Sequence, residues 1–167
     1  MLGRSLSILF LTITLASLWS CNKTAEAGGV QIQVVKDLAE LSSESRQRKL
    51  PILLVFSADH CVFCRRLERD YLKPMLRSGD YENKILIRML KVDDFSTITD
   101  FNGKKIDVEN LPNRYGGYTT PTMVFLNSEG KEIAPKLIGI GTEGFFAGEI
   151  DDSIDIAVDH TRVVAMK

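Results

Sequence analysis

The feature that most constrains the fold of this chain is an apolar run followed closely by two cysteines. The segment 52–56 is continuously apolar, which is typical of a strand buried on both faces of a sheet. Cys61 and Cys64 come next, and from Phe63 onward an apolar residue recurs every fourth position, as on one face of a helix. A buried strand that leads directly into a helix begins a βα unit. The sequence therefore predicts an α/β fold with both cysteines at the first turn of a helix.

The rest of the chain predicts further strands and helices around this unit. We expect strands at 30–35, 85–92, 124–126 and 132–138, and helices at 36–49 and 142–160. The segments 124–126 and 132–138 flank a turn composition and should pair as a hairpin. Pro135 lacks the N–H that a central strand needs, so the second strand of this hairpin should lie at the sheet edge. The expected architecture is a central mixed sheet flanked by helices.

Two local signals refine this order. Asn102-Gly103 lies between two short segments and has the composition of a tight turn, which predicts a small hairpin inserted around 96–108. Pro74 cannot donate a backbone hydrogen bond and restricts the residue before it. The helix that carries the cysteines should therefore kink or end near Lys73.

The first residues of the chain have a different character. Arg4 is followed by a stretch from Leu6 to Trp19 that is almost entirely apolar or small, and no further charge appears before Lys23. A positive start and a short apolar stretch are typical of an export signal, and this stretch is too short for a stable membrane-spanning helix. The expected organisation is an export signal, a flexible tether and one folded domain, at residues 1–21, 22–29 and 30–167.

Two processing patterns for this signal stay open. Leu18-Trp19-Ser20-Cys21 resembles a bacterial lipobox, whose cleavage would leave a lipid anchor on Cys21. Ala25-Glu26-Ala27 is a small-x-small pattern, whose cleavage would release a soluble chain that starts at Gly28. Either route removes Cys21 from the thiols of the mature chain and leaves one Cys-x-x-Cys pair.

The charge balance argues against nucleic acid as a partner. The chain has 21 lysines and arginines against 22 aspartates and glutamates, so it lacks the basic excess that phosphate backbones attract. Hydrophobic residues make up 44% and charged residues 26%, which is the composition of a globular protein. We expect no nucleic-acid binding.

The place of the cysteines gives a physical reason for reactivity. Free N–H groups and the positive end of the helix dipole favour the thiolate of Cys61, and Arg65 and Arg66 add positive charge nearby. Only a thiolate attacks a disulfide, so Cys61 is the expected nucleophile and Cys64 the resolving residue. No cofactor and no catalytic metal are expected, because the two sulfurs carry both electrons.

Other interpretations of the pair stay open. Cys61, Cys64 and His60 could form a module that handles copper or zinc, although a structural zinc site needs four ligands and only His160 would remain as a further soft ligand. The pair could also be a static bridge in a non-catalytic interaction domain, but so short a loop constrains the unfolded chain little. Covalent haem attachment requires His after the second cysteine, where this chain has Arg65.

Several motifs resemble the thioredoxin superfamily. The segment 56–64 resembles its active-site segment, in which a strand, a small linker and Cys-x-x-Cys follow in this order. Thr119-Thr120-Pro121-Thr122, followed by an apolar strand, resembles its cis-proline loop. Cys61-Val62-x-Cys64 with Glu68 one turn beyond is similar to the C-terminal thioredoxin-like domain of bacterial membrane thiol:disulfide interchange proteins. The resemblance covers about residues 30–160 and implies a thioredoxin-like fold.

The resemblance also implies residue roles. In this family the bond before the proline is cis and faces the cysteines, so Pro121 and the backbone of Thr120 should hold an extended substrate segment. His60 stands where thioredoxin has Trp, and Val55 where it has a buried acid. His60 is therefore a candidate substrate contact, and its charge near neutral pH would favour the Cys61 thiolate.

The export signal and the resemblance together imply an extracytoplasmic thiol:disulfide oxidoreductase. We expect it in a bacterial periplasm, where it is either anchored to the membrane through a lipid on Cys21 or soluble. Its expected partners are thiols and disulfides of exported proteins and a membrane-bound redox partner. The residues between the two cysteines, Val62-Phe63, do not indicate the direction of electron flow.

Overall fold

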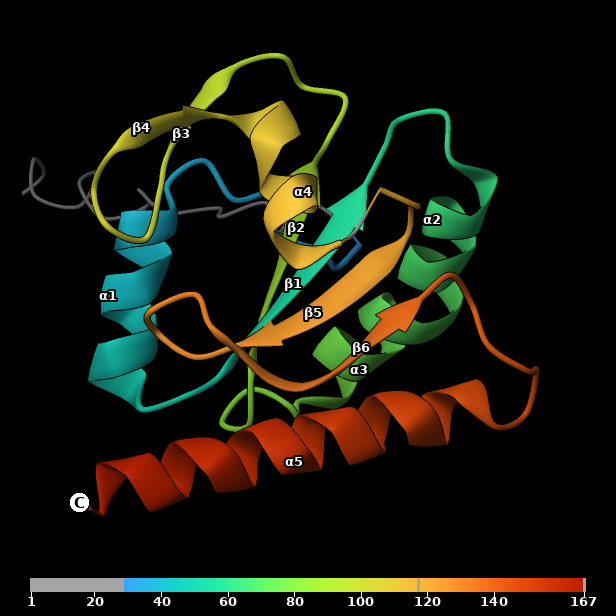
Figure 1. Cartoon of the computed structure of the whole chain (residues 1–167). Helices are drawn as coiled ribbons and strands as arrows, with labels where there is room; N and C mark the ends of the chain where they lie inside the picture. The colour runs from blue at the N-terminus through green and yellow to red at the C-terminus, as the bar shows by residue number, and fades with distance from the viewer. Residues whose placement is uncertain (1–28, 117, 167) are drawn as a thin grey trace, which may run out of the picture.

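The structure, a computed structural model, describes residues 29–116 and 118–166 (Figure 1). The expected export signal, Cys21 and the tether up to residue 28 lie outside the described residues. Within the described part of the chain, no helix combines the length and the apolar character needed to cross a membrane.

A four-stranded sheet with strand order β2-β1-β5-β6 forms the centre of the domain. Its strands are β1 (Ile52–Ser57), β2 (Leu86–Lys91), β5 (Thr122–Leu126) and β6 (Glu132–Ile138). β1 pairs in parallel with β2 and antiparallel with β5, and β5 pairs antiparallel with β6. The expected mixed sheet and the β5–β6 hairpin are thus confirmed, and Pro135 lies in the edge strand β6.

β1 is buried along its whole length because both faces of the sheet are covered. Leu53 and Val55 point into one hydrophobic cluster, whereas Ile52, Leu54 and Phe56 point into the cluster on the other face. Successive side chains of a strand alternate between faces, so only a continuous apolar run can serve two cores at once. This arrangement is the physical reason that the segment 52–56 is continuously apolar.

Different helices cover the two faces of the sheet (Figure 1). One face carries the helix of the cysteines, α2 (Val62–Leu67), with its continuation and the closing helix α5 (Phe146–Ala165). The other face carries α1 (Leu38–Arg48) and α4 (Leu111–Tyr115). α5 begins four residues later than expected, and its buried stripe is the predicted one: Phe146, Ile150, Ile154 and Ala157.

The inserted hairpin is confirmed and belongs to the core. It consists of β3 (Thr97–Thr99) and β4 (Lys105–Asp107), which pair antiparallel. Ile98 of β3 and Val108, the first residue of a 3-10 turn (Val108–Asn110), are buried in the cluster under α1. The insertion therefore covers the α1 face of the sheet.

Asp100 ties the turn of this hairpin to α4. Its backbone N–H donates to the carbonyl of Lys104 at 2.7 Å, and its carboxylate accepts the N–H of Phe101 at 2.8 Å. Arg114 of α4 binds both carboxylate oxygens at 2.8 Å. The hydrogen bonds from Arg114 hold the pKa of the Asp100 carboxyl below its ordinary value.

The prediction of a strand over 30–35 is wrong, because this segment does not pair along its length. Only a single parallel bridge forms, between Val34 and Met89 of β2. Val35 N–H donates to the Met89 carbonyl at 2.8 Å, and Met89 N–H donates to the carbonyl of Gln33 at 3.0 Å. Ile32 and Val35 are anchored in the clusters on opposite faces of the sheet, so this segment wraps the β2 edge.

The helix of the cysteines does not end near Lys73. It passes through a π-helical turn, η1 (Glu68–Leu72), and continues as α3 (Lys73–Ser78). A π turn holds an extra residue, so the hydrogen-bond ladder is already irregular where Pro74 lacks its N–H. The wider turn also brings side chains five positions apart onto one face, and Lys73 Nζ lies 2.9 Å from Glu68 Oε1. Of the two expected alternatives, a kink or an end near Lys73, the structure shows an irregular helix that continues.

Candidate active site

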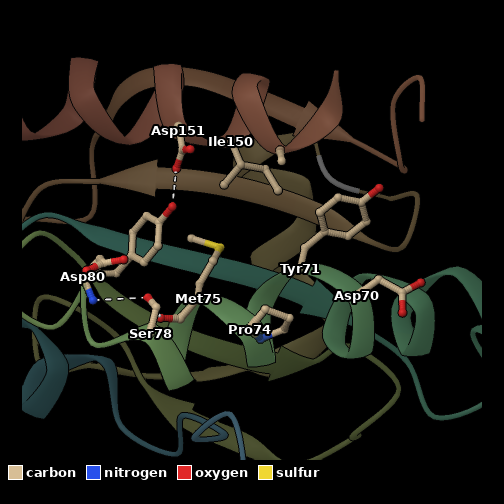
Figure 2. A pocket seen from close by; sticks show the side chains of 10 residues that line it. Asp70, Tyr71, Pro74, Met75, Ser78, Asp80, Ile150 and Asp151 are labelled. Carbon is tan, nitrogen blue, oxygen red and sulfur yellow. Dashed lines mark hydrogen bonds between the residues drawn. The ribbon is translucent and has the colours of Figure 1, made fainter. Parts of the chain in front are cut away.

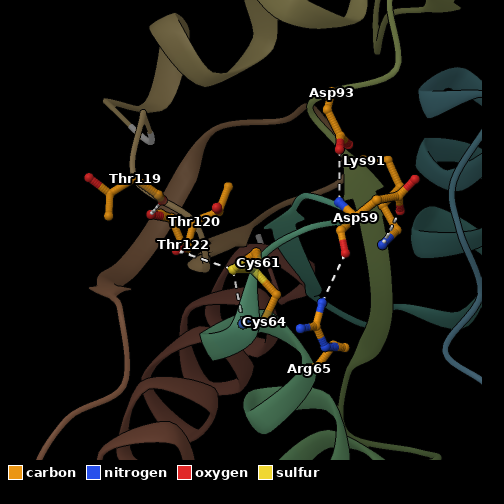
Figure 3. Close-up of a disulfide and its surroundings, with 9 residues drawn as sticks. All are labelled: Asp59, Cys61, Cys64, Arg65, Lys91, Asp93, Thr119, Thr120 and Thr122. Atoms are coloured by element: carbon orange, nitrogen blue, oxygen red, sulfur yellow. Dashed lines mark hydrogen bonds and ion pairs between the residues drawn. A yellow bond between two sulfur atoms is a disulfide. The ribbon is translucent and has the colours of Figure 1, made fainter.

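Cys61 and Cys64 lie where the buried strand β1 leads into α2 (Figure 3). They form a disulfide with an S–S distance of 2.06 Å and a Cα–Cα distance of 5.2 Å. Cys61 is the N-cap residue of α2, and its sulfur accepts the backbone N–H of Cys64 at 3.0 Å. In the reduced protein the same N–H groups at the helix start would favour a thiolate at Cys61.

The two sulfurs differ in accessibility. Cys64 is 4% exposed and packs in the interior, whereas Cys61 is half-buried at the surface. A partner molecule can therefore reach Cys61 more readily than Cys64. This asymmetry suits an attacking residue and a resolving residue, in the order that the sequence predicts.

The loop before β5 lies against the disulfide. Cys61 Sγ is 3.5 Å from the carbonyl oxygen of Thr120, and the Thr120–Pro121 peptide bond is cis. Thr122 Oγ1 donates to the carbonyl of Thr119 at 2.5 Å, which closes the loop (Figure 3). The structure thus brings Thr120 and Pro121 to the cysteines, and their role in holding a substrate stays a prediction.

The two residues between the cysteines have apolar, exposed side chains. Val62 and Phe63 are 66% and 60% exposed, so Phe63 is not part of the buried stripe of the helix. His60 is exposed and has no hydrogen bond or ion pair with any residue that the structure describes. Its role as a substrate contact stays a prediction. Val55, at the position where the resemblance implies a buried acid, is packed in the core.

Three charged residues beside the site were not among the predicted site residues. Asp59 lies in the loop that precedes Cys61, and Lys91 and Asp93 contact it (Figure 3). Asp59 comes two residues after the end of β1, Lys91 is the last residue of β2 and Asp93 comes two residues later, and the two strands are parallel neighbours. Since the carboxyl ends of parallel strands meet at one edge of the sheet, this placement is the signal that would have found them.

A cavity of about 270 Å³ lies between α3 and α5, away from the cysteines (Figure 2). Its apolar lining includes Tyr71, Met75 and Ile150, and aspartates stand at its rim. Neither cysteine lines it. The chemistry of the chain is therefore assigned to the disulfide and its loop, not to the cavity.

Tyr81, at the rim of this cavity, is expected to titrate late. Its hydroxyl donates to Asp151 Oδ1 at 2.6 Å, and this hydrogen bond is the main reason that the pKa of Tyr81 rises to about 12. An unfolded tyrosine titrates near pH ~10, so the contact stabilises the fold fully below that pH, and the stabilisation is lost as the pH rises toward about 12. Tyr115, whose burial raises its pKa, should also ionise late, so ultraviolet absorbance titration should show late ionisation at both residues, and Tyr81→Phe should remove the contribution of Tyr81. A single titration of all tyrosines near pH ~10 would contradict this.

The described residues show no cluster suited to a metal ion. Across residues 29–116 and 118–166, no group of three or more His, Cys, Asp and Glu side chains is arranged to hold one. No observation on these residues therefore favours metal handling by Cys61, Cys64 and His60 as a second candidate function.

Comparison with known proteins places this geometry in a family. Residues 38–152 match the family described as "Thioredoxin-like domain". A poplar thioredoxin h is similar in structure with a TM-score of 0.54 and 19% identity, over 75% of this chain and 98% of that one. The germline-specific thioredoxin Deadhead of Drosophila melanogaster gives 0.52 and 20%, over 74% and 97%. No curated protein sequence matches the chain.

At these identities the structural likenesses concern the fold alone. The family match covers most of the chain, and the disulfide occupies the start of the helix after the first core strand. The chain therefore belongs to the thioredoxin-like family, and its Cys61–Cys64 pair makes it a thiol:disulfide oxidoreductase.

Proposed function

We propose that this protein is exported and exchanges electrons with cysteines of exported proteins in a bacterial periplasm, and that a membrane-bound partner restores its redox state. The observation that carries the chemistry is the disulfide itself, with a half-buried Cys61 at the start of α2 and a buried Cys64 behind it. The export half of the proposal rests on Arg4 and the apolar stretch from Leu6 to Trp19.

The exchange needs only the two sulfurs. In the reducing direction, the Cys61 thiolate attacks a substrate disulfide, so a mixed disulfide forms and one substrate sulfur leaves as a thiolate that takes up a proton. Cys64, after losing its proton to solvent, attacks Cys61 Sγ and releases the second substrate sulfur. The substrate gains two electrons and the Cys61–Cys64 disulfide is regenerated. The membrane-bound partner then reduces it, and the oxidising direction is the reverse of these steps.

The loop before β5 supports recognition of an extended substrate. The Thr120 carbonyl lies 3.5 Å from Cys61 Sγ, so a backbone laid along this loop would bring its own cysteine to the reactive sulfur. Exposed Val62 and Phe63 would contact apolar residues beside that cysteine. A substrate segment that is extended and apolar fits these contacts.

Trapping of partners tests the exchange with exported proteins. The Cys64→Ala variant, expressed with its own N-terminal segment, should accumulate mixed disulfides between Cys61 and exported proteins, because nothing resolves them. Non-reducing electrophoresis and mass spectrometry would identify the adducts. The matched control is the variant that also carries Cys61→Ala, which should form none. Absence of any adduct with an exported protein would overturn the proposal.

The route of export is tested separately. Mass spectrometry of the mature N-terminus should find either a lipid-modified Cys21 in the membrane fraction or a soluble chain that begins at Gly28. Cys21→Ser should move the protein to the soluble fraction only if the first route operates. A full-length chain that stays in the cytoplasm would overturn export and leave the chemistry of Cys61 untouched.

A further inference from the structure

The loop between β1 and α2 is fastened at the residue two positions before the nucleophile. We propose that Asp93 is a positioning residue for the exchange reaction: it holds Asp59 in place, and through the short turn that follows it holds Cys61 Sγ at the start of α2 and beside Thr120. The inference rests on the exchange at Cys61 and adds to it a residue outside the Cys-x-x-Cys and proline loops.

Every polar group of Asp59 has a partner (Figure 3). Its backbone N–H donates to Asp93 Oδ2 at 2.8 Å, and its carboxylate Oδ1 lies 3.0 Å from Lys91 Nζ. Its carbonyl accepts a hydrogen bond from Arg65 Nη1 at 3.1 Å. The ammonium of Lys91, mainly through its hydrogen bond, lowers the pKa of the Asp59 carboxyl. The loop is thus tied to the end of β2 on one side and to α2 on the other.

The backbone at the end of β2, from which Asp93 contacts Asp59, is fixed by the sheet. Ser57 of β1 is paired with Lys91 of β2, and Val92 N–H donates to the Ser57 carbonyl at 2.9 Å. Asp93 is the next residue along the chain. Its carboxylate therefore reaches the loop from a backbone that the sheet already fixes, whereas the Asp59 carboxylate and Lys91 meet through longer side chains at the surface.

A displacement of Asp59 would also displace Cys61. Cys61 N–H donates to the Ala58 carbonyl at 3.3 Å, so Asp59 lies inside the turn that ends at Cys61. Cys61 Sγ in turn accepts the Cys64 N–H at 3.0 Å and lies 3.5 Å from the Thr120 carbonyl. Without Asp93, the Asp59 N–H would bind water instead, and the sulfur would spend less time at the helix start where its thiolate is favoured.

Two substitutions separate position from charge. Asp93→Asn removes the charge but keeps a side-chain oxygen that accepts the Asp59 N–H, whereas Asp93→Ala removes both. With oxidised glutathione as the probe, reduced Asp93→Ala should react about fivefold more slowly, the effect of one lost hydrogen bond, and Asp93→Asn should stay within about twofold of the unaltered protein. Asp94→Ala is the matched control, because it removes the same charge from the next residue, whose carboxylate binds the Ser96 N–H instead of the loop.

The reduction potential of the Cys61–Cys64 couple against glutathione is the second readout. It should shift in Asp93→Ala and stay unchanged in Asp93→Asn, which a general loss of stability would not produce. Equal slowing in both variants would assign the effect to charge and overturn positioning, and so would an unchanged rate in Asp93→Ala. If Asp93→Ala fails to fold, Asp93→Ser, whose hydroxyl is shorter, carries the same expectation. Failure of the unaltered protein to react at all would instead contradict the exchange chemistry.

Discussion

Replacing Cys61 with Ser is expected to lower the rate of insulin-disulfide reduction by roughly a thousandfold or more, the scale at which removal of a nucleophile is felt in other enzymes. A serine hydroxyl does not ionise near neutral pH, so the N–H groups at the start of α2 have no anion to favour. The substituted side chain would still fit the N-cap position of the helix, because Ser is a good N-cap residue. The loss should therefore be chemical and leave the fold intact.

Cys64→Ser is the matched comparison. It keeps the first attack by Cys61 at about the rate of the unaltered protein but stops turnover, because the mixed disulfide has no resolving thiol. Stopped-flow mixing with a small disulfide separates the first step from turnover. The assignment of roles would be contradicted if Cys61→Ser formed the mixed disulfide and Cys64→Ser did not.

Phe146→Ala is expected to give the largest loss of stability among single substitutions on α5, about 3–5 kcal/mol in the free energy of unfolding. Phe146 is 1% exposed and its ring meets that of Tyr71 edge-on, with 5.1 Å between the ring centroids and 86° between the planes. The contact joins α5 to the helix that carries the cysteines. The alanine variant would lose this contact and leave a cavity at the joint.

The neighbouring residue provides the control for this substitution. Phe145 is 72% exposed, so Phe145→Ala should change the free energy of unfolding by less than about 0.5 kcal/mol. Denaturant unfolding followed by circular dichroism compares the two variants at equal change in side-chain size. Similar losses for both would show that Phe146 does not carry the packing between α5 and η1.

Elements with a strong local pattern were predictable from the sequence. β1 was found because a strand that serves two cores must be apolar throughout, and α5 because its stripe of four buried residues has the period of a helix. The β3–β4 hairpin followed from Asn102-Gly103, whose glycine has a φ of 81°, a conformation that other residues rarely adopt. In each case the information lies within one short continuous stretch of the sequence.

Other features depend on contacts that local pattern does not encode. The segment 30–35 looks like a strand, yet the chain beside β2 forms only one bridge, at Val34. Pro74 signalled an irregular helix, but the sequence alone did not show whether a π turn or a helix end would absorb it. The result depends on the packing of Leu72 and Met75 in the core on either side of the proline.

The candidate site divides in the same way. Cys61 and Cys64 are neighbours in the chain, so their spacing and their place after a strand were enough to find them. Thr120 lies 59 positions from Cys61, and only resemblance to a family brought the two together before the structure did. Asp93 meets Asp59 through the register of two parallel strands, which no short motif reveals.

The way the central sheet ends on both sides has a consequence for encounters with unfolded chains. β6 presents Pro135 and the charged pair Glu132–Lys136 along one margin, and its pairing with β5 is irregular. At the other margin, residues 33–35 already occupy part of β2. The unpaired edge of a sheet can pair with a strand of another chain and so cause aggregation, and both edges of this sheet are partly protected against such pairing. A foreign strand therefore finds little free sheet edge at either margin, which lowers the tendency of the folded domain to aggregate through its sheet.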